Sequence, residues 1–214
     1  MRVRNWVYLV IIGCIFRVSL TLAQEDMDQY LQNIKGPTTE DYIQLLNEGD
    51  REDKLLAIEM LSKNDSHDDA VIDALISCLG EGTFFIKRRA GQVINDFWDV
   101  RARSAEVLGD IGDSRALTSL HDTLLHDPEL IVKCCVAEAL GKIGDPESVR
   151  YLTLIIRNTE SRGSNEVVIL SCVKALGEIG HRDGFLPLLE IARGRYRSNI
   201  RAAARDALEK LQWD

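Results

Sequence analysis

Apolar side chains recur along this chain at the spacing of an amphipathic helix, and the pattern repeats itself. In LIVKCCVAEALGKIGD (residues 130–145), Val132, Val136 and Leu140 fall on one apolar face, with polar positions opposite. Gly144 follows, where a left-handed turn that ends a helix suits a residue without Cβ. The segment therefore predicts one helix of a repeated unit, followed by a turn.

The position of Leu140 has equivalents before and after it. They are Leu61, Ile94, Leu108, Leu176 and Leu208, and with Leu140 included the steps are 33, 14, 32, 36 and 32 residues. Periods in the thirties with two helices per unit indicate an α-solenoid. Helical spacing also predicts first helices at 69–79, 114–125, 147–156 and 183–192. We therefore expect an all-α protein, a right-handed α-α superhelix of about five units.

The 14-residue step is the exception in this series. Ile86-Lys87 and Val100-Arg101 both have the pattern of a second helix, and no first helix lies between them. Fourteen residues make nearly four helical turns, so both segments can share one face of a single long helix at about 84–109. We favour this interpretation. The alternative is a break near Asn95-Asp96, with the aromatic pair that follows packed into the join.

Three copies of the helix-ending segment agree closely. They are VLGDIGD (107–113), ALGKIGD (139–145) and ALGEIGH (175–181). These segments resemble the HEAT repeats of the phycobilisome-lyase type, and the resemblance covers about residues 38–211. It implies a HEAT solenoid.

The same family pattern places a basic residue near the start of each second helix. Here these residues are Lys87, Arg101, Lys133 and Arg201. The resemblance implies that such a base pairs with the acid after the Gly-x-x-Gly turn of a neighbouring repeat, here Asp113 or Asp145. We interpret both as stacking contacts rather than as a site. His181 stands in place of that acid, so we expect a looser junction there.

The first 23 residues follow a different pattern. Basic Arg2 and Arg4 precede an apolar run at 6–16, and Thr21-Leu22-Ala23 has the small-x-small form of a cleavage site. We therefore predict a signal peptide at 1–23 and an exported bacterial protein, either periplasmic or secreted. A membrane anchor is the alternative, but the run falls short of the roughly 20 residues that span a bilayer. No transmembrane segment is expected after leader removal.

A second processing interpretation concerns Cys14. Ile11-Ile12-Gly13-Cys14 resembles a loose bacterial lipobox, in which the cysteine would carry a lipid anchor. The apolar run before Cys14 is short and continues after it, so a lipoprotein is the minor alternative. After the leader, residues 24–37 are predicted to form an acidic N-terminal capping helix that covers the open end of the stack at 38–214.

Charge narrows the choice of partners. The whole chain has a net charge of −8, and loss of three leader arginines leaves 23 bases against 34 acids, or −11. This sign disfavours nucleic-acid binding. A cluster of five arginines at 193–205 keeps that hypothesis open, against a solvated face or a patch that docks an acidic protein.

No group of residues has the pattern of a catalytic or metal site. His67, His121, His126 and His181 are scattered, and the chain has no Cys-x-x-Cys or paired His-Glu motif. We expect no metal and no cofactor. Cys78, Cys134, Cys135 and Cys172 are interpreted as buried free thiols that act as small apolar residues, with a Cys134–Cys172 disulfide as the alternative.

These observations predict a non-catalytic scaffold that binds a protein partner of unknown identity. Polar positions on consecutive second helices form a mixed-charge ladder, which we expect to line the concave side and to contact the partner. Its members are Arg103, Glu106, Glu138, Lys142, Lys174 and Glu178. A solvated face is the simpler interpretation of the same residues.

Three rival functions stay open. The family resemblance implies a phycobilin-lyase-like enzyme or a chaperone subunit, although such lyases act on cytoplasmic antenna proteins and the leader predicts export. The third rival is a purely structural spacer that retains no partner.

Overall fold

The protein is described here by a computed structural model that covers residues 36–63 and 68–213. The predicted signal peptide, the lipidation at Cys14 and nearly all of the capping helix at 24–37 lie outside the described residues, as does His67. Residues Thr39–Asp214 form one compact unit.

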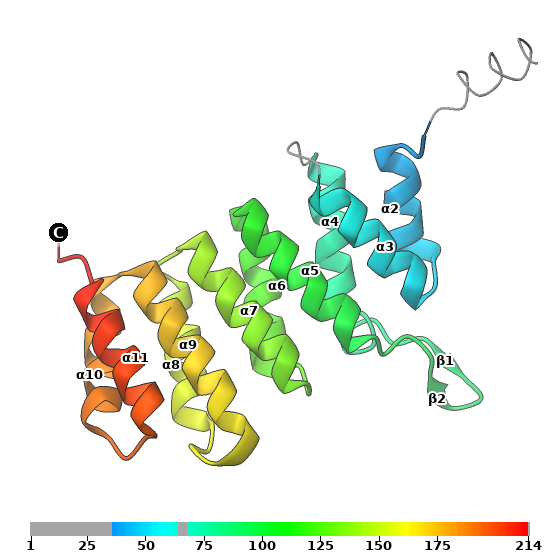
Figure 1. The fold of residues 1–214 in the computed structure, drawn as a ribbon. Coiled ribbons are helices and arrows are strands. Elements are labelled where there is room, and N and C mark those ends of the chain that lie inside the picture. The colour runs from blue at the N-terminus through cyan, green and yellow to red at the C-terminus, as the bar shows by residue number, and fades with distance from the viewer. Residues whose placement is uncertain (1–35, 64–67, 214) are drawn as a thin grey trace, which may run out of the picture. The chain divides into compact units, whose positions relative to one another are not determined.

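That unit consists of five helix pairs within the described residues, which confirms the prediction of an all-α solenoid (Figure 1). The first helices of the pairs are α2 (Thr39–Glu48), α4 (Asp69–Leu79), α6 (Leu117–His126), α8 (Ser148–Asn158) and α10 (Phe185–Arg193). The second helices are α3 (Arg51–Ser62), α5 (Trp98–Ile111), α7 (Leu130–Ile143), α9 (Glu166–Ile179) and α11 (Ser198–Glu209). Each second helix packs on its own first helix and on the second helices beside it.

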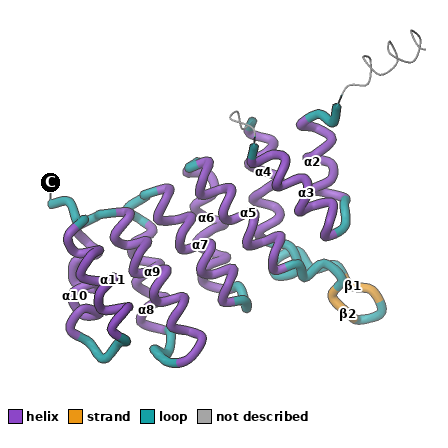
Figure 2. The backbone as a smooth tube through the Cα atoms, in the orientation of Figure 1, coloured by secondary structure: helices purple, strands orange, loops and turns teal. Residues whose placement is uncertain are grey.

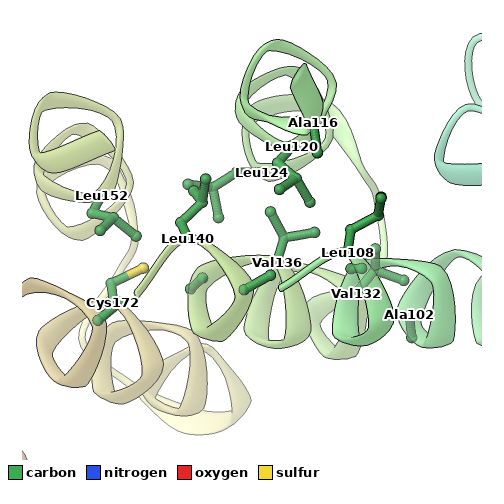
Figure 3. Packing of buried hydrophobic residues seen from close by; sticks show 14 of the residues in the cluster. Ala102, Leu108, Ala116, Leu120, Leu124, Val132, Val136, Leu140, Leu152 and Cys172 are labelled. Carbon is green, nitrogen blue, oxygen red and sulfur yellow. The ribbon is translucent and has the colours of Figure 1, made fainter. Parts of the chain in front are cut away.

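The core lies between the layer of first helices and the layer of second helices (Figure 3). Leu108 and Leu140 from second helices meet Leu120 and Leu124 from α6 there, and all four are buried. Leu61 and Leu176 are buried as well, so the predicted phase of these helices is confirmed. Leu208 is half-buried.

Three turns between units are built alike. Gly112, Gly144 and Gly180 end α5, α7 and α9 with φ of 74°, 75° and 67°, the left-handed conformation that glycine adopts without strain. The next side chain then accepts a hydrogen bond from the backbone N–H two residues on. The side chain of Asp113 accepts from the Arg115 N–H (2.8 Å), that of Asp145 from the Glu147 N–H (2.8 Å), and that of His181 from the Asp183 N–H (3.3 Å). His181 therefore takes the same capping role as the two acids.

The predicted long helix at 84–109 is wrong. Residues 80–97 instead form an irregular segment with a two-stranded antiparallel hairpin, β1 (Arg88–Arg89) and β2 (Gln92–Val93), and α5 begins only at Trp98 (Figure 2). The alternative, a break near Asn95-Asp96, is right only in part: helix begins soon after these residues and Phe97 packs against the core, but no helix directly precedes the break and Trp98 is exposed. Ala90 and Gly91 both have positive φ, 49° and 83°, which is the two-residue turn that matches strand twist. Ile94 is consequently exposed and is not an equivalent of Leu140.

The four cysteines among the described residues are free thiols. Cys78 and Cys172 are buried as expected, Cys134 and Cys135 are only half-buried, and the Cys134–Cys172 disulfide is not formed. Burial raises the pKa of the Cys78 thiol to about 11 and that of Cys135 to about 12. Neither thiol is ionised near neutral pH.

Candidate functional site

Glycine and alanine set the close spacing of the later second helices. In α5, α7 and α9 a glycine faces an alanine of the next second helix, so close that a Cβ would lie within 3.0 Å of the alanine Cα. The pairs are Gly109 with Ala139 (2.6 Å), Gly141 with Ala175 (3.0 Å) and Gly177 with Ala207 (2.8 Å). Real Cβ atoms do not fit at such distances, so each glycine permits a backbone approach that other residues would prevent.

The junction between α3 and α5 lacks this pair. Counting from the buried leucines Leu61 and Leu108, the residue in the glycine position is Ser62, and the residue in the alanine position is Val107. Both side chains are larger, and α3 and α5 contact each other less extensively than α5 and α7 do. The α3–α5 junction therefore lacks the glycine–alanine pair that permits the close approach of the later second helices.

A groove of about 530 Å³ opens at the same junction, with Ser62 on its wall. Residues of three second helices line it, namely Leu55, Glu59, Ser62 and Lys63 of α3, Trp98, Asp99, Ala102, Arg103 and Glu106 of α5, and Ile131 and Cys135 of α7. Trp98 and Ile131 are 43% and 54% exposed. Large apolar side chains in this state are the usual anchors of a protein interface.

Charged side chains around the groove are paired with one another. Arg51 bridges the junction to Asp99, with its Nε 3.1 Å from Oδ1. Arg103 pairs with Glu106 at 2.7 Å and Lys63 with Glu59 at 2.9 Å. Hydrogen bonding to Asp99 raises the pKa of Arg51, so that bridge stays ionised. The groove thus combines apolar anchors with a rim of balanced charge.

The six predicted ladder residues all lie on second helices, half-buried or exposed, so their helical phase is as expected. Arg103 and Glu106 lie in the groove, and the other four do not. Glu138 accepts a hydrogen bond from Ser171 (3.3 Å), and Lys142 pairs with Asp110 (2.6 Å). Lys174 and Glu178 are exposed on α9. Participation of the six in partner binding stays a prediction.

Sequence reasoning missed the groove and its aromatic anchor. The long-helix interpretation includes Trp98, and the repeat pattern does not distinguish Ile131 from its neighbours. One signal in the sequence could have indicated the groove. Gly109, Gly141 and Gly177 occupy the same repeat position in the later units, and Ser62 stands at that position in α3.

The basic residues of the second helices do not pair as the resemblance implied. Asp113 and Asp145 cap their own turns, and of the four predicted bases Lys133 donates to the end of the preceding first helix. Lys87 lies in the hairpin segment and on no helix. Lys133 Nζ donates to the carbonyl of Leu125 (3.1 Å), and Lys54 Nζ donates to that of Leu46. The last carbonyls of a helix lack intrahelical partners, so a buried base beside them satisfies both groups.

Arg101 of α5 makes a larger hydrogen-bond network than the lysines do. Its guanidinium is fully buried, and it donates to the Glu81 carbonyl (3.0 Å), to Asp96 (2.7 Å) and to buried Asp127 (2.7 Å). Burial would lower the pKa of Arg101, but the hydrogen bonds to the two carboxylates outweigh it and raise the pKa. The network joins both ends of the hairpin segment to the solenoid. Arg201, by contrast, has a buried Nε without a hydrogen-bond partner.

Two kinds of site are not found among the described residues. No group of three or more His, Cys, Asp or Glu side chains in this part of the chain is placed to hold a metal ion. Among its helices, none combines the length and apolarity that crossing a bilayer requires.

Comparison with known proteins agrees with this geometry. A family model for HEAT repeats matches residues 91–164, which span α5 to α8. This segment therefore carries HEAT repeats. A solved structure of the complex of CpcE and CpcF of phycocyanin lyase from Nostoc sp. PCC7120 is similar, with a TM-score of 0.65 and 22% sequence identity over 84% of this chain and 67% of that chain. At this identity the likeness is one of fold. No curated protein matches significantly.

Proposed function

We propose that this HEAT-repeat protein is a non-catalytic scaffold that binds a protein partner in the groove between α3, α5 and α7. The groove carries the proposal, because it opens at the junction where Ser62 and Val107 replace the close glycine–alanine contact. Solenoids commonly use their extended surfaces for binding. Partial exposure of Trp98 and Ile131 in the groove supplies an apolar centre inside a charged rim, the composition of a protein interface.

The test removes the apolar anchors. W98A/I131S should weaken capture of the partner at least about tenfold, since truncating an interface anchor typically costs 2 kcal/mol or more. Crosslinking and pull-down from cell envelopes would measure this, because the leader pattern leads us to propose that the protein is exported. A matched control is V167S/L186S, which removes two apolar side chains that are exposed elsewhere. Equal capture by W98A/I131S and the wild type would contradict the proposal.

Charge reversal separates the groove from the longer ladder. Glu106 lies in the groove and Glu178 does not. If the groove alone binds, E106K weakens capture and E178K leaves it unchanged. If the partner lies along the whole ladder of second helices, both variants weaken it. Neither change should shift the melting temperature by more than a few degrees, because both side chains lie at the surface.

A lyase-like activity is the second candidate, and the fold shared with a phycocyanin lyase complex favours it. The expected difference is simple to measure. A lyase-like protein incubated with free phycocyanobilin should retain the pigment and show a shifted absorption spectrum after gel filtration. A scaffold should elute without colour.

A further inference from the structure

The hairpin segment between α4 and α5 stands away from the helices (Figures 1 and 2). Every residue from 84 to 94 is exposed, on both faces of the two strands. An isolated two-stranded hairpin is only marginally stable in water, and its strands gain stability from a third strand or a covering surface. The solenoid supplies neither at the tip.

The root of the hairpin is nevertheless held firmly. Buried Asn95, which follows β2, donates from Nδ2 to the Phe85 carbonyl (2.7 Å) and accepts from the Lys87 N–H (2.8 Å), so its side chain holds the chain that leads into β1. Arg101 fixes the two ends of the segment through Glu81 and Asp96. An exposed element with a fixed root is suited to present its side chains to another molecule.

The hairpin is locally basic in an acidic protein. Residues 82–95 contain Lys87, Arg88 and Arg89 and no acid, whereas the whole chain has a net charge of −8. None of the three bases makes an ion pair with the described residues. Ile86, Val93 and Ile94 beside them are 36–47% exposed. The charge of this element therefore calls for an acidic partner with some apolar side chains.

Both edges of the hairpin are open for strand addition. Arg88 pairs with Val93, and the Ile94 N–H donates to the Lys87 carbonyl (3.0 Å) in the next pair. Inward and outward hydrogen bonding alternate along antiparallel strands, so the backbone groups of Arg88 and Val93 point outward. Such an unpaired edge is a template for an extended peptide.

We propose that the hairpin docks an extended acidic segment of a partner protein, which adds as a strand to its edge and, because alternate side chains share a face, places carboxylates beside Lys87 and Arg89. A membrane surface fits the arrangement less well. The bases lie at and beside the turn, while Ile86 and Ile94 lie nearer the root, so the charged tip would have to pass the headgroups before the apolar side chains reached the bilayer. This docking element is separate from the groove of α3, α5 and α7.

The test uses the full chain and a fluorescein-labelled peptide of alternating Glu and Val, titrated by fluorescence anisotropy. K87E/R88E/R89E should weaken binding at least about tenfold, because several charge-assisted contacts are reversed together. The matched control R193E/R195E/R205E reverses three arginines that are also exposed and make no ion pair with the described residues, and it should bind within about twofold of the wild type. W98A/I131S should bind this peptide normally, whatever it does to capture in the groove.

Several outcomes would overturn the docking proposal. The first is that the wild type does not bind the Glu-Val peptide. The second is that a Lys-Val peptide binds equally well. The third is that K87E/R88E/R89E and the control R193E/R195E/R205E lose binding to the same extent. Binding to phosphatidylglycerol vesicles that the hairpin reversal abolishes, without peptide binding, would assign the hairpin to a membrane instead. Thermal melts by circular dichroism verify that each variant is folded, and the two triple reversals should melt within a few degrees of the wild type.

Discussion

The later part of the stack, from α5 to α11, and the region from α3 to the start of α5 are stabilised by different interactions. In the later part, the second helices meet through glycine and alanine, at distances that leave no room for a Cβ. In the earlier region, charged side chains make the contacts, and all of those named here except Asp96 are buried. Lys54 pairs with Glu81 at 3.1 Å, and Arg101 joins Asp96 and Asp127.

The difference shows how a repeat protein can carry an irregular insertion. The glycine–alanine contacts let consecutive units stack in the same way, because they require only small side chains and no specific charge or hydrogen-bond partner. The insertion at 80–97 interrupts that series and leaves polar backbone near the core, which must be paired when it is buried. Arg101 and Asn95 provide those pairs. Both candidate docking surfaces, the groove and the hairpin, lie beside this interruption.

The largest effect should come from removing Arg101. R101L leaves the carboxylate of Asp127 buried without its cation, and breaking a buried pair in this way costs about 3–5 kcal/mol of unfolding free energy. Urea denaturation would measure the loss. The matched variant is R115L, whose pairs with Asp69 and Asp113 lie at the surface, where ion pairs contribute little stability. If R101L proved as stable as R115L, the network would not be what fixes the hairpin segment.

A smaller effect should follow from crowding a glycine–alanine contact. G109V places a side chain 2.6 Å from the Ala139 Cα, and such overpacking typically costs about 1–3 kcal/mol. S62V introduces the same side chain beside the open groove. We expect it to change the free energy of unfolding by less than about 0.5 kcal/mol. Thermal melts of the two variants compare the junctions directly. Equal destabilisation would show that the α3–α5 junction is as tight as the later ones.

The smallest effect concerns acid stability of the later part. His121 is buried, stacks on Tyr151 with ring centroids 3.9 Å apart, and has Nε2 2.9 Å from the Ser148 hydroxyl. Burial lowers the pKa of His121 below its ordinary 6.5, so the unfolded chain binds the proton more readily than the folded one. The stability that neutral His121 contributes is therefore complete above pH 6.5 and is lost as the pH falls through its folded-state pKa.

Melting temperatures measured from about pH 7 down to about pH 5 should show this loss. In H121Q the slope over this range should be shallower, because glutamine does not titrate, although the variant is expected to melt lower at neutral pH after losing the ring stack. A slope identical in H121Q and the wild type would assign the acid sensitivity to other groups.

The ends of the helices and the buried faces could be read from the sequence because they depend on neighbouring residues. Helical spacing placed Leu61, Leu108, Leu140 and Leu176 in the core, and the glycines after α5, α7 and α9 marked where those helices end. The reasoning failed at 84–109 for a local reason too. Ile86-Lys87 imitates the start of a second helix, but the adjacent Ala90-Gly91 turn and the clamp by Asn95 favour a hairpin.

The amino-acid sequence by itself determined the helical repeat, its period near 32 residues, the phase of the second helices and the acidic balance of the chain. Only the tertiary structure decided which repeats touch closely and which buried charges meet. Arg101 finds Asp127 twenty-six positions away, and the groove brings together residues of three second helices, α3, α5 and α7. Helix formation is set by contacts a few residues apart, whereas spacing between helices depends on pairs of side chains that only the packed stack brings together.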